Sequence, residues 1–159
     1  MTDHVDALQS GVVYGEDIEV GRRYRLGSYT ITERELVDFA GLWDPQGFHV
    51  DKDVADAGAY EGLIASGLHT LAVYQRLAVL DVFSGWSVIA GRRLREVRFL
   101  RPVRPGDTLT GTVVIQDVAF DDRDRALVTT AAELTDAQVR PVLSVDVEAY
   151  VRARPPQIS

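Results

Sequence analysis

The stretch SGLHTLAVYQRLAVLDVF, residues Ser66–Phe83, predicts a long helix that lies inside the molecule. Ser66 is a good N-cap residue, because its side-chain oxygen can accept a hydrogen bond from a free amide of the first turn. The apolar residues that follow cover most of the helix circumference: Leu68, Leu71, Ala72, Leu77, Ala78 and Leu80. A helix that is apolar nearly all round is typical of a buried position.

The chain after Gly85 is rich in β-structure signals. Four β-rich runs follow, the last three separated by turn-like acidic segments: SVIAGRRLREVRFLRPV, DTLTGTVVIQDVAF, RALVTTAAELTD and VRPVLSVDVEAYVRA. Arg104–Asp107, RPGD, predicts a tight turn between the first two runs, and Arg22–Thr32 predicts a strand before the helix. We therefore predict an α+β domain in which a meander of antiparallel strands wraps around one central helix. Such a sheet leaves edges uncovered, so we expect a homodimer or a dimer of dimers.

Two short helices are predicted between the first strand and the central helix. Thr32–Glu35, TERE, matches a capping box at the start of a helix that Gly41 closes. The segment VDKDVADAG predicts a second, acidic helix.

The stretch GLWDPQGFHVD, Gly41–Asp51, is predicted to be a loop, since proline and glycine interrupt regular structure. Trp43 and Phe48 are expected to be buried and to anchor it. The loop then holds an acid, Asp44, and an imidazole, His49, which can share a water and divide the acid and base roles. Taken alone the pair is a weak signal, because an aspartate before proline is usually a turn former.

The start of the central helix is a second candidate for chemistry. Ser66 and Gly67 lie where backbone amides are free and the helix dipole is positive. Plain capping is the commoner explanation for this pair. The functional alternative is that the Gly67 amide, unobstructed by a side chain, donates to a carbonyl oxygen. His69, two positions later, is interpreted as an interior or interface group rather than a catalytic one, and His4 as a group without a role.

Composition limits the class of protein. The 159 residues favour one domain over 1–159, with a core from about 14 to 150 and loose ends at 1–13 and 153–159. The absence of cysteine excludes disulfides and thiol nucleophiles and suits a cytoplasmic location. We see no signal peptide and no membrane span, because the most apolar segment is interrupted by Gln75, Arg76 and Asp81. The net charge of −7 argues against a nucleic-acid partner.

One short segment is strongly basic although the chain is acidic. It contains a single acid, Glu96, and six arginines: Arg92, Arg93, Arg95, Arg98, Arg101 and Arg104. Guanidinium groups in this density suit a polyanionic small ligand. A strand that keeps its charges in solvent explains the pattern equally well.

Three motifs in this order, WDPQGFHVD, GLIASGLHT and VRFLRPVRPGD, resemble the MaoC-like dehydratase family, whose relatives include the R-specific enoyl-CoA hydratases. The resemblance extends from about Tyr14 to Tyr150 and implies a hot-dog fold that dimerises into a continuous sheet. It departs within the first motif: the best-studied hydratases have Asp, any residue, Asn, Pro, a hydrophobic residue and His, whereas Gln46 here occupies the asparagine position. Ser66 likewise replaces a histidine that is common in part of the family.

The resemblance implies a hydro-lyase that adds or removes water at the α,β double bond of an acyl thioester. Asp44 and His49 match the catalytic acid and histidine, and Ser66 and Gly67 match the helix start that binds the thioester oxygen. The substrate is carried on coenzyme A or an acyl-carrier protein, and no metal or redox cofactor is required. Candidate contacts for the carrier phosphates are Arg92, Arg93, Arg101 and Arg104.

Three other functions are compatible with the sequence. A hot-dog thioesterase is the main alternative, although the central helix has no acid before Asp81, where such an enzyme usually has a carboxylate. A non-catalytic acyl-thioester binding subunit is expected to lack the Asp44–His49 pair, which this chain retains. A small-ligand sensor without turnover is the third.

Overall fold

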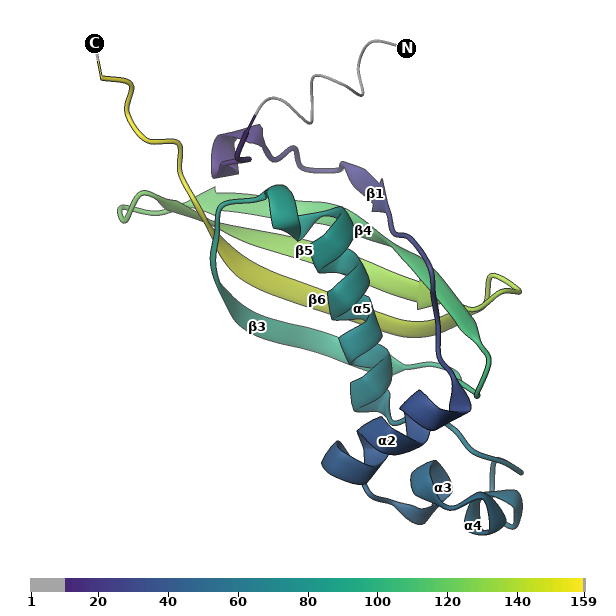
Figure 1. Cartoon of the computed structure of the whole chain (residues 1–159). Helices are drawn as coiled ribbons and strands as arrows, with labels where there is room; N and C mark the ends of the chain where they lie inside the picture. The colour runs from purple at the N-terminus through teal and green to yellow at the C-terminus, as the bar shows by residue number, and fades with distance from the viewer. Residues whose placement is uncertain (1–10, 159) are drawn as a thin grey trace.

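A computed structural model describes residues 11–158 and shows an antiparallel sheet curved around one long helix, α5 (Gly67–Asp81) (Figure 1). The sheet has six strands: β1 (Arg23–Arg25), β2 (Tyr29–Thr30), β3 (Val88–Phe99), β4 (Thr108–Phe120), β5 (Arg125–Thr135) and β6 (Pro141–Arg152). The α+β fold with a sheet around a central helix is therefore confirmed. The strand predicted over 22–32 is two short strands, both paired with β4.

The predicted order of the long strands is wrong in one respect. The strands run β1-β4-β5-β6-β3, so β3 pairs with β6 and lies at the edge far from β4. The RPGD turn exists, with the Asp107 amide donating to the Arg104 carbonyl at 3.0 Å, but it belongs to a connection between opposite sides of the sheet. Side-chain alternation predicts which face of a strand is buried and does not specify which strand lies beside it.

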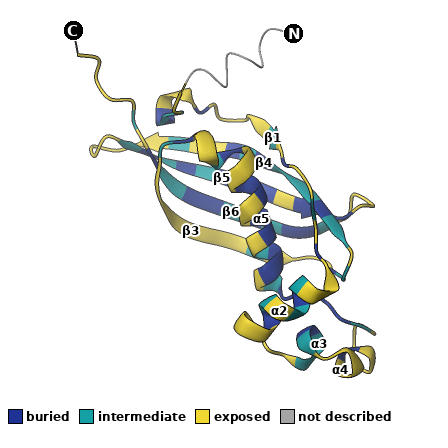
Figure 2. Cartoon of the chain, in the orientation of Figure 1, coloured by how far each residue is buried: buried dark blue, intermediate teal, exposed yellow. Residues whose placement is uncertain are grey.

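The core lies between the concave face of the sheet and one face of α5. The helix contributes Val73, Tyr74, Leu77 and Ala78, which are all buried. Figure 2 shows the buried residues of β4, β5 and β6 behind the helix. The sheet leaves part of this largely apolar helix uncovered in the single chain, since Leu68 and Leu80 are 52% and 57% exposed.

The segment before α5 contains more helix than predicted. It forms α2 (Glu33–Trp43), α3 (Gly47–Val50) and α4 (Lys52–Asp56). Two 3-10 turns lie elsewhere, at Gly15–Asp17 and, after α5, at Phe83–Gly85. Gly41 does not close α2. The helix ends two residues later, because the residue before Pro45 is disfavoured in a helical conformation.

Two predictions around α2, the capping box at its start and the aromatic anchors of the loop after it, are each right for one residue and wrong for the other. The Thr32 hydroxyl accepts from the Glu35 amide at 3.2 Å, as in a capping box, but the Glu35 carboxylate accepts a hydrogen bond from the Tyr29 hydroxyl. Phe48 packs against the core, whereas Trp43 is 68% exposed and does not anchor the segment.

Both ends of the described chain make specific contacts, although they were expected to be loose. Val13 forms a parallel bridge with Trp86, and its amide donates to the Gly85 carbonyl at 2.8 Å. Arg154 binds Glu16 through its amide and Asp17 through its guanidinium group. Residues 1–10 and 159 lie outside the described part, so the prediction for them stays open. Within residues 11–158, no helix is both long and apolar enough to cross a membrane.

Close packing between β4 and β5 makes Gly111 irreplaceable, and Gly85, in the 3-10 turn after α5, offers a control. A Cβ atom at Gly111 would lie 2.1 Å from the Glu133 carbonyl oxygen, whereas one at Gly85 meets nothing within 4 Å. We expect Gly111→Ala to lower the free energy of unfolding by at least about 2 kcal/mol. Gly85→Ala should change it by less than about 0.5 kcal/mol. Urea denaturation measures both, and equal effects would contradict the close approach.

Candidate active site

The candidate site forms where four segments meet at the start of α5. Asp44 is the C-cap residue of α2, and His49 lies in α3. Ser66 and Gly67 begin α5, and the end of β3 with the chain that follows it supplies Phe99 and the residues up to Val103. These segments enclose a cavity of about 510 Å³, whose lining includes Asp44, Gln46, His49, Gly67, Phe99 and Arg101.

Hydrogen bonds hold both oxygens of the Asp44 carboxylate. The Ser66 hydroxyl donates to Oδ2 at 2.7 Å, and the Gln46 side-chain amide donates to Oδ1 at 2.8 Å. These bonds, the one from Ser66 above all, hold the pKa of Asp44 below its usual range. Asp44 is therefore a carboxylate at neutral pH.

The protonation of His49 follows from its backbone partner. Its Nδ1 lies 2.7 Å from the Ile64 carbonyl oxygen, which can only accept, so Nδ1 carries a proton. The other nitrogen, Nε2, lies 3.3 Å from Oδ2 of Asp44. The imidazole is 5% exposed, so the neutral form presents a basic nitrogen beside a carboxylate in a nearly dry setting. This pair can share one proton or one water molecule.

The start of α5 offers a free amide to the same cavity. The Ser66 oxygen accepts a hydrogen bond from the Leu68 amide at 3.2 Å, and the Ser66 hydroxyl donates its own hydrogen bond to Asp44. Among residues 11–158, no acceptor takes a hydrogen bond from the Gly67 amide. A Cβ atom at position 67 would come within 2.9 Å of three ring carbons of Phe99, so only glycine fits beneath this ring as it lies.

The candidate arginines separate into two groups. Arg101 lines the cavity and donates to the Pro141 carbonyl, and Arg104 donates to the carbonyl of Tyr60, another lining residue. Arg92 and Arg93 do not line this cavity.

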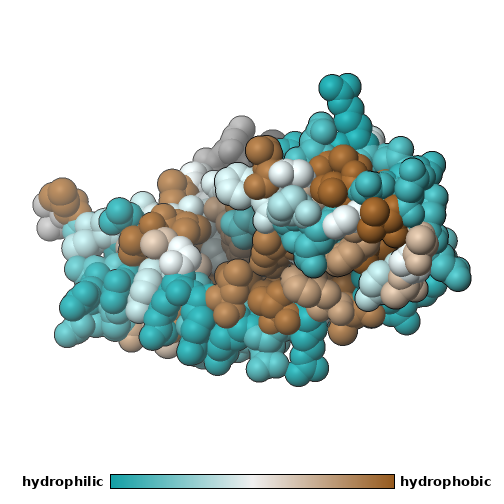
Figure 3. Space-filling model, turned by 90° about the horizontal axis from the view of Figure 1, so that it is seen from below, coloured by the Kyte–Doolittle hydropathy of each residue, from teal (hydrophilic) through white to brown (hydrophobic). Residues whose placement is uncertain are grey.

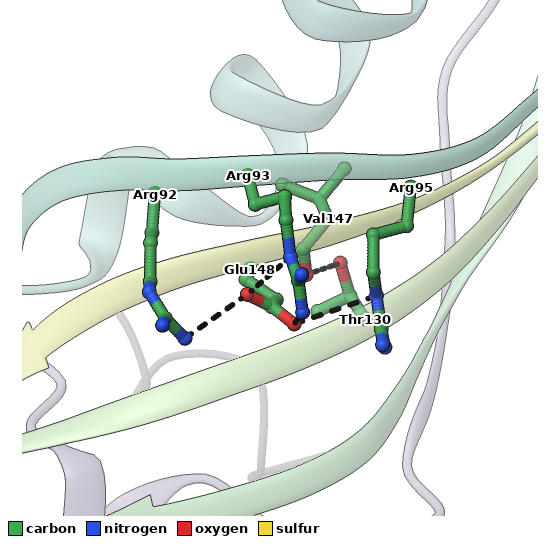
Figure 4. A network of polar contacts seen from close by, with 6 residues as sticks. All are labelled: Arg92, Arg93, Arg95, Thr130, Val147 and Glu148. Carbon is green, nitrogen blue, oxygen red and sulfur yellow. Dashed lines mark hydrogen bonds and ion pairs between the residues drawn. The ribbon is translucent and has the colours of Figure 1, made fainter.

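Arg92 and Arg93 belong instead to an ion-pair cluster on the sheet. Figure 4 shows them and Arg95 directed at the carboxylate of Glu148 on β6, with nitrogen–oxygen distances of 3.3, 2.9 and 3.4 Å. Glu148 is 5% exposed in its side chain, and its bonds with these arginines, Arg93 above all, hold its pKa below the usual range, so it is a carboxylate that balances part of their positive charge. The structure thus brings Asp44, His49, Ser66, Gly67 and Arg101 together, with Arg104 adjacent, and leaves Arg92 and Arg93 elsewhere.

Sequence reasoning missed three contributors to the site. Gln46 had a signal, because it occupies the asparagine position of the family motif. Phe99 lies within the third motif, but nothing in the pattern places its ring over Gly67. The Ile64 carbonyl had no signal, since it is a backbone group fifteen residues from His49. No three His, Asp or Glu side chains within 11–158 gather as ligands of a metal ion.

We expect Ser66→Ala to raise the pKa of Asp44 toward its ordinary value, because the strongest hydrogen bond to the carboxylate is lost. With a higher pKa, Asp44 takes up its proton at a higher pH during acidification. Carbon-13 NMR titration of aspartate carboxyl groups measures this, and Gln46→Ala should give a smaller shift of the same sign. The Asp136 carboxylate, bound by Arg140, is the internal control in the same spectra. An unchanged pKa of Asp44 would contradict the geometry.

Comparison with known proteins identifies the family. The model of the MaoC like domain matches residues 17–138. A protein of Bacillus subtilis named YdeM and described as uncharacterized is 34% identical over 102 residues, which are 64% of this chain and 72% of that protein. An (R)-specific enoyl-CoA hydratase of Rhodospirillum rubrum is 31% identical over 103 residues, 64% of this chain and 69% of that enzyme.

The fold agrees with this assignment. The crystal structure of a MaoC-like dehydratase from Rhodospirillum rubrum superposes with a TM-score of 0.81 at 30% identity, covering 91% of this chain and 99% of that one. The sheet around a central helix is the hot-dog fold of these proteins. The chain therefore belongs to the MaoC-like dehydratase family.

Proposed function

We propose that this protein is a hydro-lyase that adds water to, or removes it from, the α,β double bond of an acyl thioester. The observation that carries the proposal is the Asp44–His49 pair, 3.3 Å apart, in one cavity with the free Gly67 amide. Membership of a family that includes an (R)-specific enoyl-CoA hydratase supports the same reaction class.

In the proposed hydration, His49 and Asp44 hold one water over the double bond. Nε2 of His49 accepts a proton from the water as its oxygen bonds to C3, and the π electrons move toward the thioester oxygen. Asp44, held as a carboxylate by Ser66 and Gln46, stabilises the imidazolium that forms. The Gly67 amide donates to the developing enolate oxygen, a contribution of about 3 kcal/mol for a single donor. The same proton then passes to C2, so the step consumes one water and nothing else.

The carrier of the acyl group is proposed to be coenzyme A or an acyl-carrier protein, with no metal or redox cofactor. Arg101 and Arg104 lie where they can bind the carrier phosphates, because each uses a guanidinium group to contact a carbonyl at or beside the cavity and retains further donors. Arg92 and Arg93 could contact the carrier phosphates only in the site of a second copy, and this role stays a prediction. The cytoplasmic location also stays a prediction.

Loss of enoyl-thioester absorbance on mixing purified protein with crotonyl-CoA or a longer enoyl-CoA tests the reaction. We expect Asp44→Asn and His49→Ala each to lower kcat by about 10²- to 10⁴-fold, because each removes one member of the acid–base pair. Asp38→Asn is the matched control, since that carboxylate is exposed on the same helix.

Each other outcome of this assay has a distinct meaning. Free thiol released by the wild-type protein, and lost in Asp44→Asn, would favour the thioesterase. A protein that binds these thioesters without converting them would instead fit the binding subunit or the sensor.

We also propose that the chain forms a homodimer through β3. Within residues 11–158 this strand pairs with β6 alone, so its other edge is unpaired, and most of its twelve residues are exposed. Val88, Ile89, Leu94 and Phe99 are each at least 41% exposed. Figure 3 shows apolar side chains gathered on the surface seen from below. An unpaired edge of this length is stabilised by pairing with a second copy about a two-fold axis.

Sedimentation measures the assembly, and we expect a mass of twice the 17.6 kDa of one chain. Leu94→Asp should shift the protein toward monomer, because it places a charge on the open strand. Val139→Asp, in the turn between β5 and β6 and 77% exposed, should leave the mass unchanged. A wild-type mass of 17.6 kDa at micromolar concentration would contradict the dimer.

A further inference from the structure

His69 is a buried titratable group that the proposed mechanism does not use. It lies in the first turn of α5, three residues after Ser66, and it is 3% exposed. Within the described residues its Nδ1 has no hydrogen-bond partner. Burial lowers the pKa of His69, against an opposing effect of Glu35. A buried polar side chain with an unpaired nitrogen costs stability, so its presence requires an explanation.

Two side chains of α2, Phe39 and Glu35, contact His69. Its ring stacks on Phe39, with centroids 4.5 Å apart and planes inclined by 12°. Its Nε2 lies 3.7 Å from Oε1 of Glu35, which also accepts a hydrogen bond from Tyr29. His69 therefore joins the first turn of α5 to the middle of α2.

These two helices carry Asp44 and the Ser66–Gly67 pair, whereas His49 lies in α3. Asp44 is the C-cap of α2, and its amide donates to the Ala40 carbonyl at 2.8 Å, so its position follows that of the helix. Ser66 is the N-cap of α5. A rotation or slide of α2 over α5 would lengthen the 2.7 Å hydrogen bond between Ser66 and Asp44, because the two residues belong to different helices.

We infer that His69 is a positioning residue: through Phe39 and Glu35 it fixes α2 on α5 and so keeps Asp44 on Ser66 beside His49. The inference rests on the proposed function only for its effect on turnover. Its effect on the Asp44–Ser66 hydrogen bond is independent of any reaction. An error of about 1 Å in the position of a catalytic group can cost about 10²-fold in rate.

The test uses three variants of the full-length protein. His69→Ala removes both contacts, His69→Phe retains an aromatic ring against Phe39, and Glu35→Gln removes the charge opposite His69. Leu80→Ala is the control, because Leu80 lies on the same helix, is 57% exposed and is distant from α2. The readouts are the pKa of Asp44 by carbon-13 NMR, and kcat and KM for an enoyl-CoA.

We expect His69→Ala to raise the pKa of Asp44 and to lower kcat by about 10²-fold with little change in KM, because the pair is displaced while the cavity persists. His69→Phe should recover part of both effects, and Leu80→Ala should change neither. If His69→Ala is folded and leaves the pKa of Asp44 and kcat unchanged, the inference is overturned.

Two further outcomes are also decisive. If His69→Ala does not fold, the test rests on His69→Phe and Glu35→Gln. An unchanged pKa of Asp44 in both of these variants then overturns the inference. If the wild-type protein converts no thioester but the Asp44 pKa still rises in His69→Ala, the positioning role stands and the proposed function fails.

Discussion

The hydrogen bond from Ser66 to Asp44 is the interaction on which the geometry of the candidate site depends. The hydroxyl donates a hydrogen bond to the carboxylate, and its oxygen accepts a hydrogen bond from the Leu68 amide. One side chain thus joins the end of α2 to the start of α5. It also places a negative charge near the positive end of the central helix. With Asp44 held in this way, its carboxylate lines the same cavity as His49 and Gly67.

The fold keeps this junction in place by burying the rest of the helix. Val73 and Leu77 of α5 pack into the concave face of the sheet, so the N-terminus of the helix cannot shift without disturbing the core. Strand β3 links the sheet to the site directly, since it ends at Phe99, whose ring covers Gly67. The open edge of β3 is also the proposed dimer contact, so the proposed assembly and the site depend on one strand.

Local patterns in the sequence predicted the elements and the main candidate residues. The cap at Ser66 predicted α5, the β-rich composition of the four long runs predicted the strands, and the motifs indicated Asp44, His49 and Gly67 as one group. The pairing of β3 with β6 could not be predicted, because the composition of a strand carries no information about its neighbours. The exposure of Trp43 and the pairing of Arg92 with Glu148 depend on tertiary contacts between distant residues. The contact of His49 with the Ile64 carbonyl involves a backbone group and leaves no pattern at all.

Incubation with a 3-hydroxyacyl-CoA in oxygen-18 water, followed by mass spectrometry, tests the central claim most directly. If Asp44 and His49 exchange water across the α,β bond, heavy oxygen enters the C3 hydroxyl group of the intact thioester, and it fails to enter when His49 is replaced by alanine. Heavy oxygen found only in a released free carboxylic acid, or in no product at all, would contradict the account.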